Sequence, residues 1–230
     1  MYFQHSSDIW RAFPELAPGV LIAEGITCDV AVSPQVTRFG ALAEARLAGT
    51  SAGELPEIQA WRRMFSRMGF KPTQYRCAAE SLLRRFTKEG SLPRIHPLID
   101  LCNAVSLTYA IPVAVFDASK IAKYLQVRHA TGDESYVTFS GKTENPEPDE
   151  VIFADAAGRA HARRWTHRQS AYSAVRDTTS AVVIVAEGMH VSAAADIQKL
   201  MTTLADELHA LCPVTLRTAL LDQSHPRFEF

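Results

Sequence analysis

Apolar residues in the first half of this chain recur at the spacing of amphipathic helices. Four segments place apolar side chains three and four positions apart, which predicts helices over 37–48, 55–68, 76–88 and 96–109. Gly69 and Gly90 follow two of these segments, at the position where helices commonly end. The fourth segment is nearly all apolar, so we expect that helix to be buried.

The second half of the chain changes to the pattern of strands. Short runs rich in β-branched and aromatic residues predict strands at 113–116, 124–129, 134–139, 151–154, 160–165, 181–187 and 214–220. An earlier run, 20–28, predicts one strand ahead of the helices, and no element is predicted before it. Ser192 caps a long amphipathic helix that we expect to reach about Leu211.

This order of elements favours a single α+β domain over residues 1–230, of the mixed α/β kind, with a central mixed sheet flanked by helices. The chain is long enough to bury one sizeable core, and residues 222–230 are expected to form a loose tail.

The composition is typical of a soluble globular protein, with 47% apolar and 21% charged residues. No apolar run is long enough to cross a bilayer, and the first residues lack the pattern of a signal peptide. Four widely separated cysteines form no CxxC pair, so we expect free thiols rather than disulfides or zinc ligands. A cytoplasmic protein without membrane contact is therefore predicted.

The usual signatures of catalysis are missing. The chain contains no phosphate-binding glycine loop, no HExxH and no GxSxG. His161 and His167 are six residues apart, which is not typical of metal ligands, so we predict neither a metal nor another cofactor. His96, directly before Pro97, is a candidate general base, and capping of the helix that follows is the alternative.

One stretch, 159–179, concentrates positive charge. The whole chain has a formal charge of −1, whereas this stretch carries five arginines together with Trp165 and Tyr172. Arginine forks suit phosphate and aromatic faces suit bases, so the stretch predicts contact with RNA; scattered surface arginines are the alternative. The predicted RNA-binding residues are Arg159, Arg163, Arg168 and Arg176.

Three separated segments together resemble a known family. They read RIHPLIDLCNAVSLTYAIPVAVFDASKI, LQVRHATGDESYVTFSGKTENPEPDEVIFADAAGRAHARRW and SAYSAVRDTTSAVVIVAE. In this order they are similar to the tRNA-editing module (B3/B4 domain) of the bacterial phenylalanyl-tRNA synthetase β subunit. An upstream segment, GFKPTQYRCAAESLLRRFTKEG, resembles the free-standing form of that module, and the resemblance covers about 69–187.

The resemblance implies an enzyme, a metal-independent hydrolase of aminoacyl-tRNA. Such modules hydrolyse the ester between a wrong amino acid and the terminal ribose of a tRNA, and the free-standing forms act after the synthetase has released its product. Main-chain groups and the neighbouring ribose hydroxyl place the water, so positioning and electrostatic stabilisation supply much of the acceleration. The implied partner is the acceptor end of a mischarged tRNA, while any synthetase partner and the oligomeric state stay open.

The same resemblance assigns roles to individual residues. Asn103, on the polar face of a helix with Asp100, lines the pocket. Arg128 and Glu134 match the family's arginine and glutamate, and the glutamate is expected to bind the substrate ammonium. The predicted catalytic residues are thus Asn103, Glu134 and His96. Asp100 as a turn cap, and Arg128 with Glu134 as a cross-strand pair, are the alternatives.

Residues 163–168 occupy the place where the synthetase module has a glycine-rich loop. This departure implies a bulkier and more cationic pocket, which argues against tyrosine as the rejected amino acid. Asp177 and Thr178 match an Asp-Thr pair of the family, with a simple turn as the alternative. The predicted substrate-binding residues are Asp100, Arg128, Arg164, Trp165, Asp177 and Thr178.

Acidic residues near the predicted pocket suggest which amino acid is removed. Asp100, Glu134, Glu144 and Asp177 suit a basic side chain, since an unpaired cation is costly to bury. Some free-standing relatives clear the arginine analogue canavanine, so canavanyl-tRNA(Arg) is the leading prediction. The alternatives are editing of tyrosyl-tRNA(Phe), a non-catalytic tRNA- or RNA-binding module with the same fold, and hydrolysis of a small amino-acid ester without nucleic acid.

Overall fold

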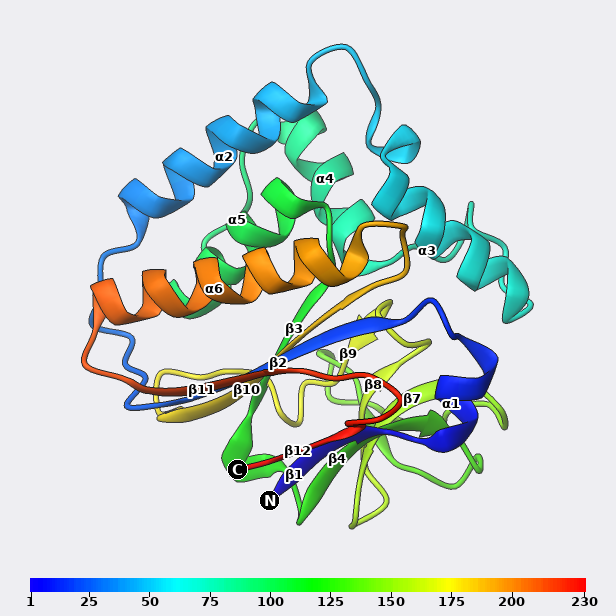
Figure 1. Ribbon diagram of the computed structural model, residues 1–230. Coiled ribbons are helices and arrows are strands. Elements are labelled where there is room, and N and C mark those ends of the chain that lie inside the picture. Colours follow the sequence, from blue (N-terminus) through cyan, green and yellow to red (C-terminus); the bar gives the residue numbers. More distant parts are fainter.

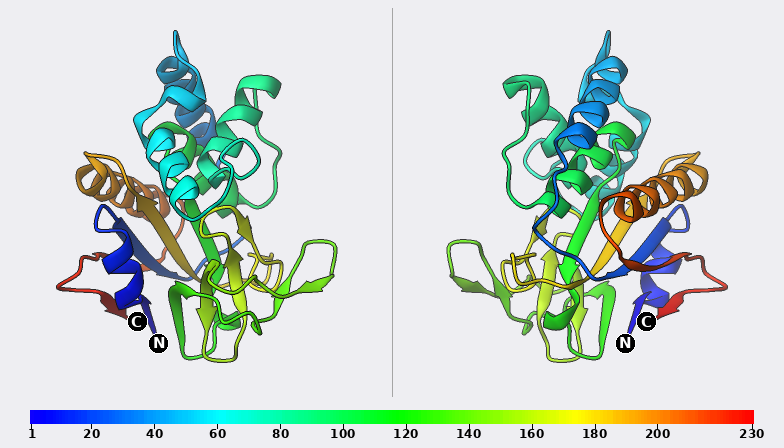
Figure 2. Two further views of the ribbon diagram at one scale, coloured as in Figure 1. Left: turned by 90° about the vertical axis from the view of Figure 1, so that its right-hand side faces the viewer. Right: turned by 90° about the vertical axis from the view of Figure 1, so that its left-hand side faces the viewer.

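The computed structural model describes residues 1–230 and combines a helical layer with two main sheets (Figure 1, Figure 2). The helices are α1 (Ser7–Ala12), α2 (Ser33–Leu47), α3 (Pro56–Arg67), α4 (Ala78–Glu89), α5 (Pro97–Tyr109) and α6 (Ala193–Leu211), with short 3-10 turns at Ala52–Glu54 and Ala118–Lys120. The strands are β1 (Tyr2–His5), β2 (Ala17–Glu24), β3 (Val113–Asp117), β4 (Tyr124–His129), β5 (Tyr136–Val137), β6 (Thr143–Glu144), β7 (Val151–Asp155), β8 (Ala160–Arg163), β9 (Arg168–Gln169), β10 (Ala181–Gly188), β11 (Thr215–Leu220) and β12 (Arg227–Glu229). The predicted α+β class is confirmed.

A four-stranded antiparallel sheet supports the helical layer. Its order is β11-β2-β10-β3, and α6 packs across β2 and β10 (Figure 1). Helix α5 contacts both α6 and α2, and eight of its thirteen residues are buried. Because apolar residues cover most of its surface, α5 can pack on several neighbours at once. The predicted burial of this helix is confirmed.

The other main sheet contains the predicted mixed pairing. Its order is β12-β1-β4-β7-β8-β9, with β1 parallel to β4 and the remaining pairs antiparallel. The prediction of a loose tail is wrong for Arg227–Glu229, which pair with β1, and the two termini lie side by side (Figure 2). These short strands escape notice in the sequence because a period of two is hard to detect over three or four residues.

Most predicted elements lie within four residues of the observed ones, and two predicted strands are shorter than expected. The runs 134–139 and 160–165 form only β5 and β8, which end at Val137 and Arg163. At Arg164 and Trp165 the backbone adopts φ angles of 47° and 56°. Two consecutive left-handed residues turn the chain out of the strand, and the sequence gives no glycine or asparagine to signal that turn.

The two main sheets meet at Glu187 on β10, which is 2% exposed. Its carboxylate Oε1 lies 2.7 Å from His5 Nε2 on β1 and accepts a hydrogen bond of 2.9 Å from Trp165 Nε1. Its backbone carbonyl accepts a 3.3 Å hydrogen bond from Trp61 Nε1 on α3. One residue therefore links both sheets to the helical layer.

None of the helices has the length and apolar character that crossing a membrane requires.

Replacing Phe3 with alanine tests whether the N-terminal strand belongs to the core. Phe3 is fully buried and stacks near Phe153, so Phe3→Ala should lower the free energy of unfolding by about 3–5 kcal/mol in a urea titration. Leu42→Ala is the control, because Leu42 is 50% exposed and its truncation should cost less than about 1 kcal/mol. Equal stability of the two variants would show that β1 is not part of the folded core.

Candidate functional site

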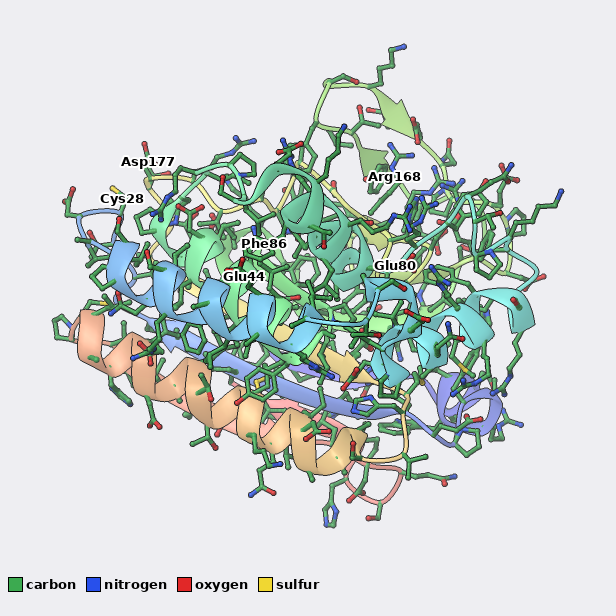
Figure 3. The ribbon with its side chains drawn as sticks, turned by 90° about the horizontal axis from the view of Figure 1, so that it is seen from above. Cys28, Glu44, Glu80, Phe86, Arg168 and Asp177 are labelled. Atoms are coloured by element: carbon green, nitrogen blue, oxygen red, sulfur yellow. The ribbon has the colours of Figure 1, made fainter.

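A cavity of about 350 Å³ lies between α2, α5 and the segment that joins α4 to α5. Asp100 and Asn103 line it from α5, Glu44 lines it from α2, and Phe86 lines it from α4. Figure 3 shows Glu44 and Phe86 close together between these helices. We call it the α2–α5 cavity. It brings together two predicted site residues, Asp100 and Asn103, three positions apart on one helix face.

Asp100 and Asn103 differ in what they can offer a ligand. The Asp100 carboxylate accepts a 2.9 Å hydrogen bond from the Ile95 backbone N–H and lies 3.5 Å from the Arg94 guanidinium. Asp100 therefore holds the segment that closes the cavity, in agreement with the alternative prediction that it caps a turn. The side-chain amide of Asn103 has no hydrogen-bond partner in the chain, and the Glu44 carboxylate forms no ion pair, so both remain available.

His96 caps α5. Its Nδ1 accepts a 3.2 Å hydrogen bond from the Leu98 backbone N–H, and its Nε2 is buried without a partner. Burial lowers the pKa of His96, and the carboxylates of Asp177 and Asp100 partly oppose that effect. The ring does not line the α2–α5 cavity. The structure thus shows the capping role, and it places the exposed Asp177 near the N-terminal end of α5.

Arg128 and Glu134 are paired within a closed turn, away from that cavity. The Glu134 carboxylate, 2% exposed, accepts hydrogen bonds from Arg128 (2.5 Å) and from the backbone N–H groups of Thr131 and Gly132 (both 3.1 Å). Burial alone would raise the pKa of Glu134, but these donors outweigh burial and hold the pKa at about 2. Glu134 is a fixed anion with most of its acceptor capacity already used.

The stretch 159–179 divides into buried and accessible residues. Trp165 is buried against Phe13 and Trp61 and does not line the α2–α5 cavity; it lines a smaller cavity of about 60 Å³ beside Glu187. Arg163, 4% exposed, donates two hydrogen bonds to Glu150 (3.0 and 2.9 Å) and one to Glu144 (3.0 Å). It was predicted to bind RNA, but its guanidinium is buried in these contacts and does not reach the surface.

The other members of this stretch reach the surface. Arg164 lies over the rings of Tyr75 (4.9 Å) and Phe70 (5.9 Å), and Arg168 is 3.5 Å from Glu144. Arg159 lies over Tyr172 (4.6 Å) and 3.6 Å from Asp155. Arg176 and Thr178 are exposed without an ion pair or a side-chain hydrogen bond. Figure 3 places Asp177 on the opposite side of the molecule from Arg168, so the stretch does not form one compact site.

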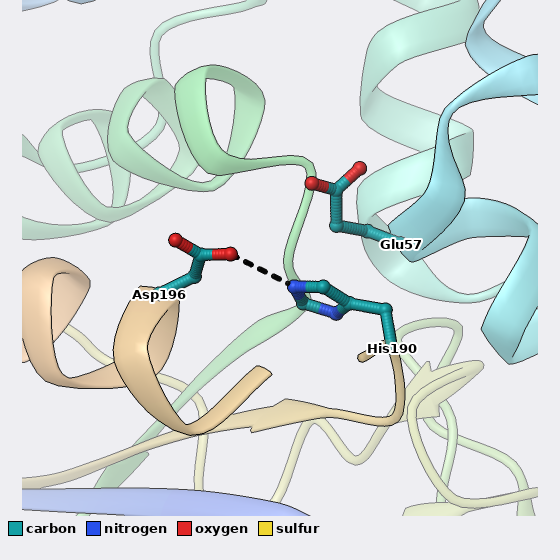
Figure 4. A group of neighbouring side chains, drawn as sticks. All are labelled: Glu57, His190 and Asp196. Atoms are coloured by element: carbon teal, nitrogen blue, oxygen red, sulfur yellow. Dashed lines mark hydrogen bonds and ion pairs between the residues drawn. The ribbon is translucent and has the colours of Figure 1, made fainter. Parts of the chain in front are cut away.

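Glu57, His190 and Asp196 form the one group that could hold a metal ion, with three ligand atoms within 4.8 Å of one another (Figure 4). Ligands of a tetrahedral zinc lie closer, about 3.4 Å apart for bonds of about 2.1 Å. Glu57 already pairs with Arg46 (2.5 Å), and Asp196 binds His190 (3.2 Å) and the Ser192 hydroxyl (2.6 Å). With a guanidinium as its neighbour, the group is better described as two ion pairs, Arg46–Glu57 between α2 and α3, and His190–Asp196 at the start of α6.

Sequence reasoning missed three features of the candidate site. Glu44 lies nearly sixty residues from the other cavity acid, so no local motif could identify it. Glu187 lines a second, smaller cavity of about 60 Å³ with Gln169 and His167. In the sequence it lies near the end of an apolar strand, and its distance from other polar residues matches no known motif. A second concentration of cations, on α3 and α4, could have been found by counting charge over residues 62–89.

A family model described as the B3/4 domain matches residues 60–208, which is more than half of the chain. The chain therefore belongs to the B3/4 domain family. Among curated proteins it is similar to the phenylalanine–tRNA ligase β subunit of Bradyrhizobium diazoefficiens, with 37% identity over 79 residues, 34% of this chain and 10% of that protein. The same subunit from Mannheimia succiniciproducens is 36% identical over 64 residues, 28% of this chain and 8% of that protein.

Among solved structures, the comparison finds similarity to an N-terminal fragment of the phenylalanyl-tRNA synthetase β subunit from Pyrococcus horikoshii. The TM-score is 0.46 and the identity 11%, over 94% of this chain and 50% of the other. The chain spans a tenth or less of the length of the two curated relatives described above. The predicted resemblance to the B3/B4 domain is confirmed at the level of the family.

Glu134→Gln should destabilise the protein in a pH-dependent way. A carboxyl whose pKa is lowered from 4.5 to about 2 stabilises the fold above pH 4.5, and this contribution is lost as the pH falls toward 2. We expect a loss of about 2 kcal/mol at pH 7, from hydrogen bonds to a charged group, that vanishes near pH 2 in denaturant titrations. Glu147→Gln, at an exposed position, should change little at any pH. A pH-independent loss would contradict the role of the Glu134 charge.

Proposed function

We propose that this chain hydrolyses the ester that joins a wrong amino acid to the terminal ribose of a tRNA. The observation that carries the proposal is the α2–α5 cavity, which offers an unpaired amide and an unpaired carboxylate in a B3/4 domain. Its volume of about 350 Å³ is at the lower end of small-molecule sites, which suits a single amino-acid moiety. The names of the curated relatives, ligases of phenylalanine and tRNA, support an aminoacyl-tRNA as the substrate.

The proposed reaction is the addition of water to the ester carbonyl. A tetrahedral intermediate forms, the bond between the carbonyl carbon and the ribose oxygen breaks, and that oxygen takes up a proton as the free amino acid leaves. Asn103 can orient the water or donate to the developing oxyanion from its free amide. An ester is already activated, so positioning contributes much of the acceleration.

The cysteines give no competing nucleophile within the core. Cys102 follows Leu101 on α5 and is 2% exposed, and burial raises the pKa of its thiol to about 12. Burial also raises the pKa of the Cys77 thiol to about 12. Both stay protonated near neutral pH, and a thiol is a far weaker nucleophile than a thiolate. Direct attack by water is therefore the mechanism that this chain supports.

The cavity acids favour a substrate with a basic side chain. Glu44 is unpaired, and Asp100 lies on the same wall with one cation, Arg94, beside it. Of the other predicted acids, Glu134 and Glu144 are paired with arginines outside the cavity. Canavanine, an arginine analogue, fits this arrangement, because an ionised guanidinium-like group needs a carboxylate partner when it leaves water. Tyrosine would leave the Glu44 carboxylate without a partner.

A deacylation panel tests the proposed function. Purified protein is mixed with tRNA(Arg) charged with canavanine or arginine and with tRNA(Phe) charged with tyrosine or phenylalanine. We expect release of canavanine with the cognate pairs spared, and Asn103→Ala should slow this release by about 100-fold, as expected for loss of one oxyanion or water contact. Asn145→Ala, at the chain's other asparagine, is the matched control and should keep the full rate. Binding of tRNA with release of no amino acid would favour the non-catalytic module instead.

Glu44→Gln tests which side chain enters the cavity. The substitution removes the unpaired charge from an exposed helix position, so folding should be unaffected while kcat/KM for canavanyl-tRNA falls about tenfold. Glu24→Gln, outside the cavity, should leave kcat/KM unchanged. If Glu44→Gln raised or preserved kcat/KM for the canavanyl substrate, a basic side chain would not be what Glu44 recognises.

A further inference from the structure

Residues 62–89 hold a larger excess of positive charge than the stretch 159–179. They contain eight Lys and Arg side chains against two acids, Glu80 and Glu89, in a chain whose formal charge is −1. An excess of six charges in one segment attracts polyanions if the fold keeps the cations on one face. The eight cations are Arg62, Arg63, Arg67, Lys71, Arg76, Arg84, Arg85 and Lys88.

Helices α3 and α4 do gather these cations along one open groove. A hollow of about 770 Å³ lies between α4 and the α2–α3 connection, and a neighbouring recess of about 640 Å³ runs along α3. Arg62 lines both, so the two are continuous, and we call them together the basic groove. Its cationic lining comprises Arg62, Arg63, Arg67, Arg84, Arg85 and Lys88.

A single buried carboxylate fixes the centre of the groove. Glu80, 1% exposed, accepts two hydrogen bonds from Arg62 (3.1 and 2.6 Å) and lies 3.4 Å from Arg76 and 3.9 Å from Arg84. An added Cβ at Gly53 would lie 2.8 Å from an Arg62 nitrogen, so glycine leaves the room that this guanidinium occupies. Three guanidinium groups around one carboxylate are held in place and still carry a net positive charge.

Other cations of the segment have no counter-charge at all. Arg63, Lys71 and Lys88 form no ion pair and no side-chain hydrogen bond, and all three are exposed. The nearby Glu54 carboxylate is occupied by the backbone N–H and hydroxyl of Ser51 (both 2.8 Å). Arg67 and Arg85 pair with two acids that also line the groove, Glu15 (2.8 Å) and Glu89 (2.9 Å). Arg63 and Lys88 are thus lining cations without a counter-charge, which an anionic ligand would supply.

We propose that the basic groove binds the sugar-phosphate backbone of RNA. This inference rests on the proposed function, because the RNA would be the acceptor arm of the tRNA whose ester enters the α2–α5 cavity. Helix α4 separates the two sites: Arg85 and Lys88 line the groove, while Phe86 lines the cavity. The distance to cross is therefore the width of one helix, about 10 Å, which the unpaired 3′ end of a tRNA can span.

The arrangement suits a polymer of phosphates better than a small anion or a membrane. The cations are spread along two helices of twelve residues, each about 18 Å long, and do not converge on one point. No exposed large hydrophobic side chain lines the groove, whereas membrane-surface helices bury apolar side chains.

An aromatic patch continues the groove. Tyr75, in the α3–α4 connection, lies under the Arg164 guanidinium and 5.4 Å from the His167 ring. His167 Nδ1 lies 2.7 Å from the backbone carbonyl of Arg76, which joins this patch to the start of α4. Figure 3 shows Arg168 and Glu80 on the same side of the molecule, so part of the stretch 159–179 faces the same region as α4. Aromatic faces beside phosphate-binding cations are typical of single-stranded RNA sites.

The double variant Arg63→Glu with Lys88→Glu tests the groove, because neither residue forms an ion pair whose loss would weaken the fold. The matched control is Lys120→Glu with Lys123→Glu, which changes the net charge equally at exposed positions that form no ion pair and lie outside the groove. Binding of unfractionated tRNA is measured by fluorescence anisotropy between 50 and about 200 mM salt. We expect the groove variant to raise Kd at least about tenfold and to reduce the salt slope by about 2, and the control to match the unmodified protein.

A second assay distinguishes failure of the groove proposal from failure of the proposed function. It measures hydrolysis of canavanine esterified to adenosine, which has the ribose but no phosphate for the groove to bind. The groove variant should hydrolyse that ester at the unmodified rate. Equal tRNA affinity for the two double variants would overturn the groove proposal and leave deacylation standing. Binding to vesicles of phosphatidylserine and phosphatidylcholine in place of tRNA would also overturn it. If the groove variant lost tRNA binding, but neither it, the control nor the unmodified protein hydrolysed any ester, the groove proposal would be supported and the proposed hydrolase rejected.

Discussion

The buried carboxylate of Glu187 holds the two sheets and the helical layer in one arrangement. It contacts His5 from the edge strand β1 and Trp165 from the turn after β8, while its backbone carbonyl accepts from Trp61 on α3. A buried carboxylate without partners would cost several kcal/mol, so the chain needs the contacts that His5 and Trp165 make with it. Polar contacts of this kind specify one packing of otherwise interchangeable apolar surfaces.

The turn at Arg164 and Trp165 places the Trp165 ring in that contact. Both residues have positive φ, which is unfavourable for side chains with a Cβ, and the burial of the Trp165 ring between Phe13 and Trp61 offsets the strain. The turn carries Arg164 outward over Tyr75 and brings His167 to the backbone of Arg76. The basic surface of α3 and α4 and part of that of the later stretch are thereby placed on one side of the molecule.

How far the sequence could predict this structure depends on how far apart the interacting residues are. Helices α2 to α6 were predictable because each apolar period is contained within its own segment, whereas α1, of six residues, was missed. The burial of Arg163 was missed because its partner Glu150 lies just before β7, outside the stretch 159–179, and a count of charges does not reveal pairing. The burial of Trp165 was missed for the same reason, since its partner Glu187 belongs to β10. Glu44 and Asn103 share a cavity only because α2 packs on α5.

The central claim is that the α2–α5 cavity and the basic groove act on one aminoacylated RNA. Amide chemical-shift mapping tests it most directly, with an acceptor-arm minihelix that carries canavanine through a non-hydrolysable amide at its 3′ end. The claim predicts shifts at Glu44, Phe86 and Asn103 in the cavity, together with shifts at Arg63 and Lys88 in the groove. Shifts confined to the small cavity beside Glu187, or to the face of α6 that points away from the sheet, would contradict it.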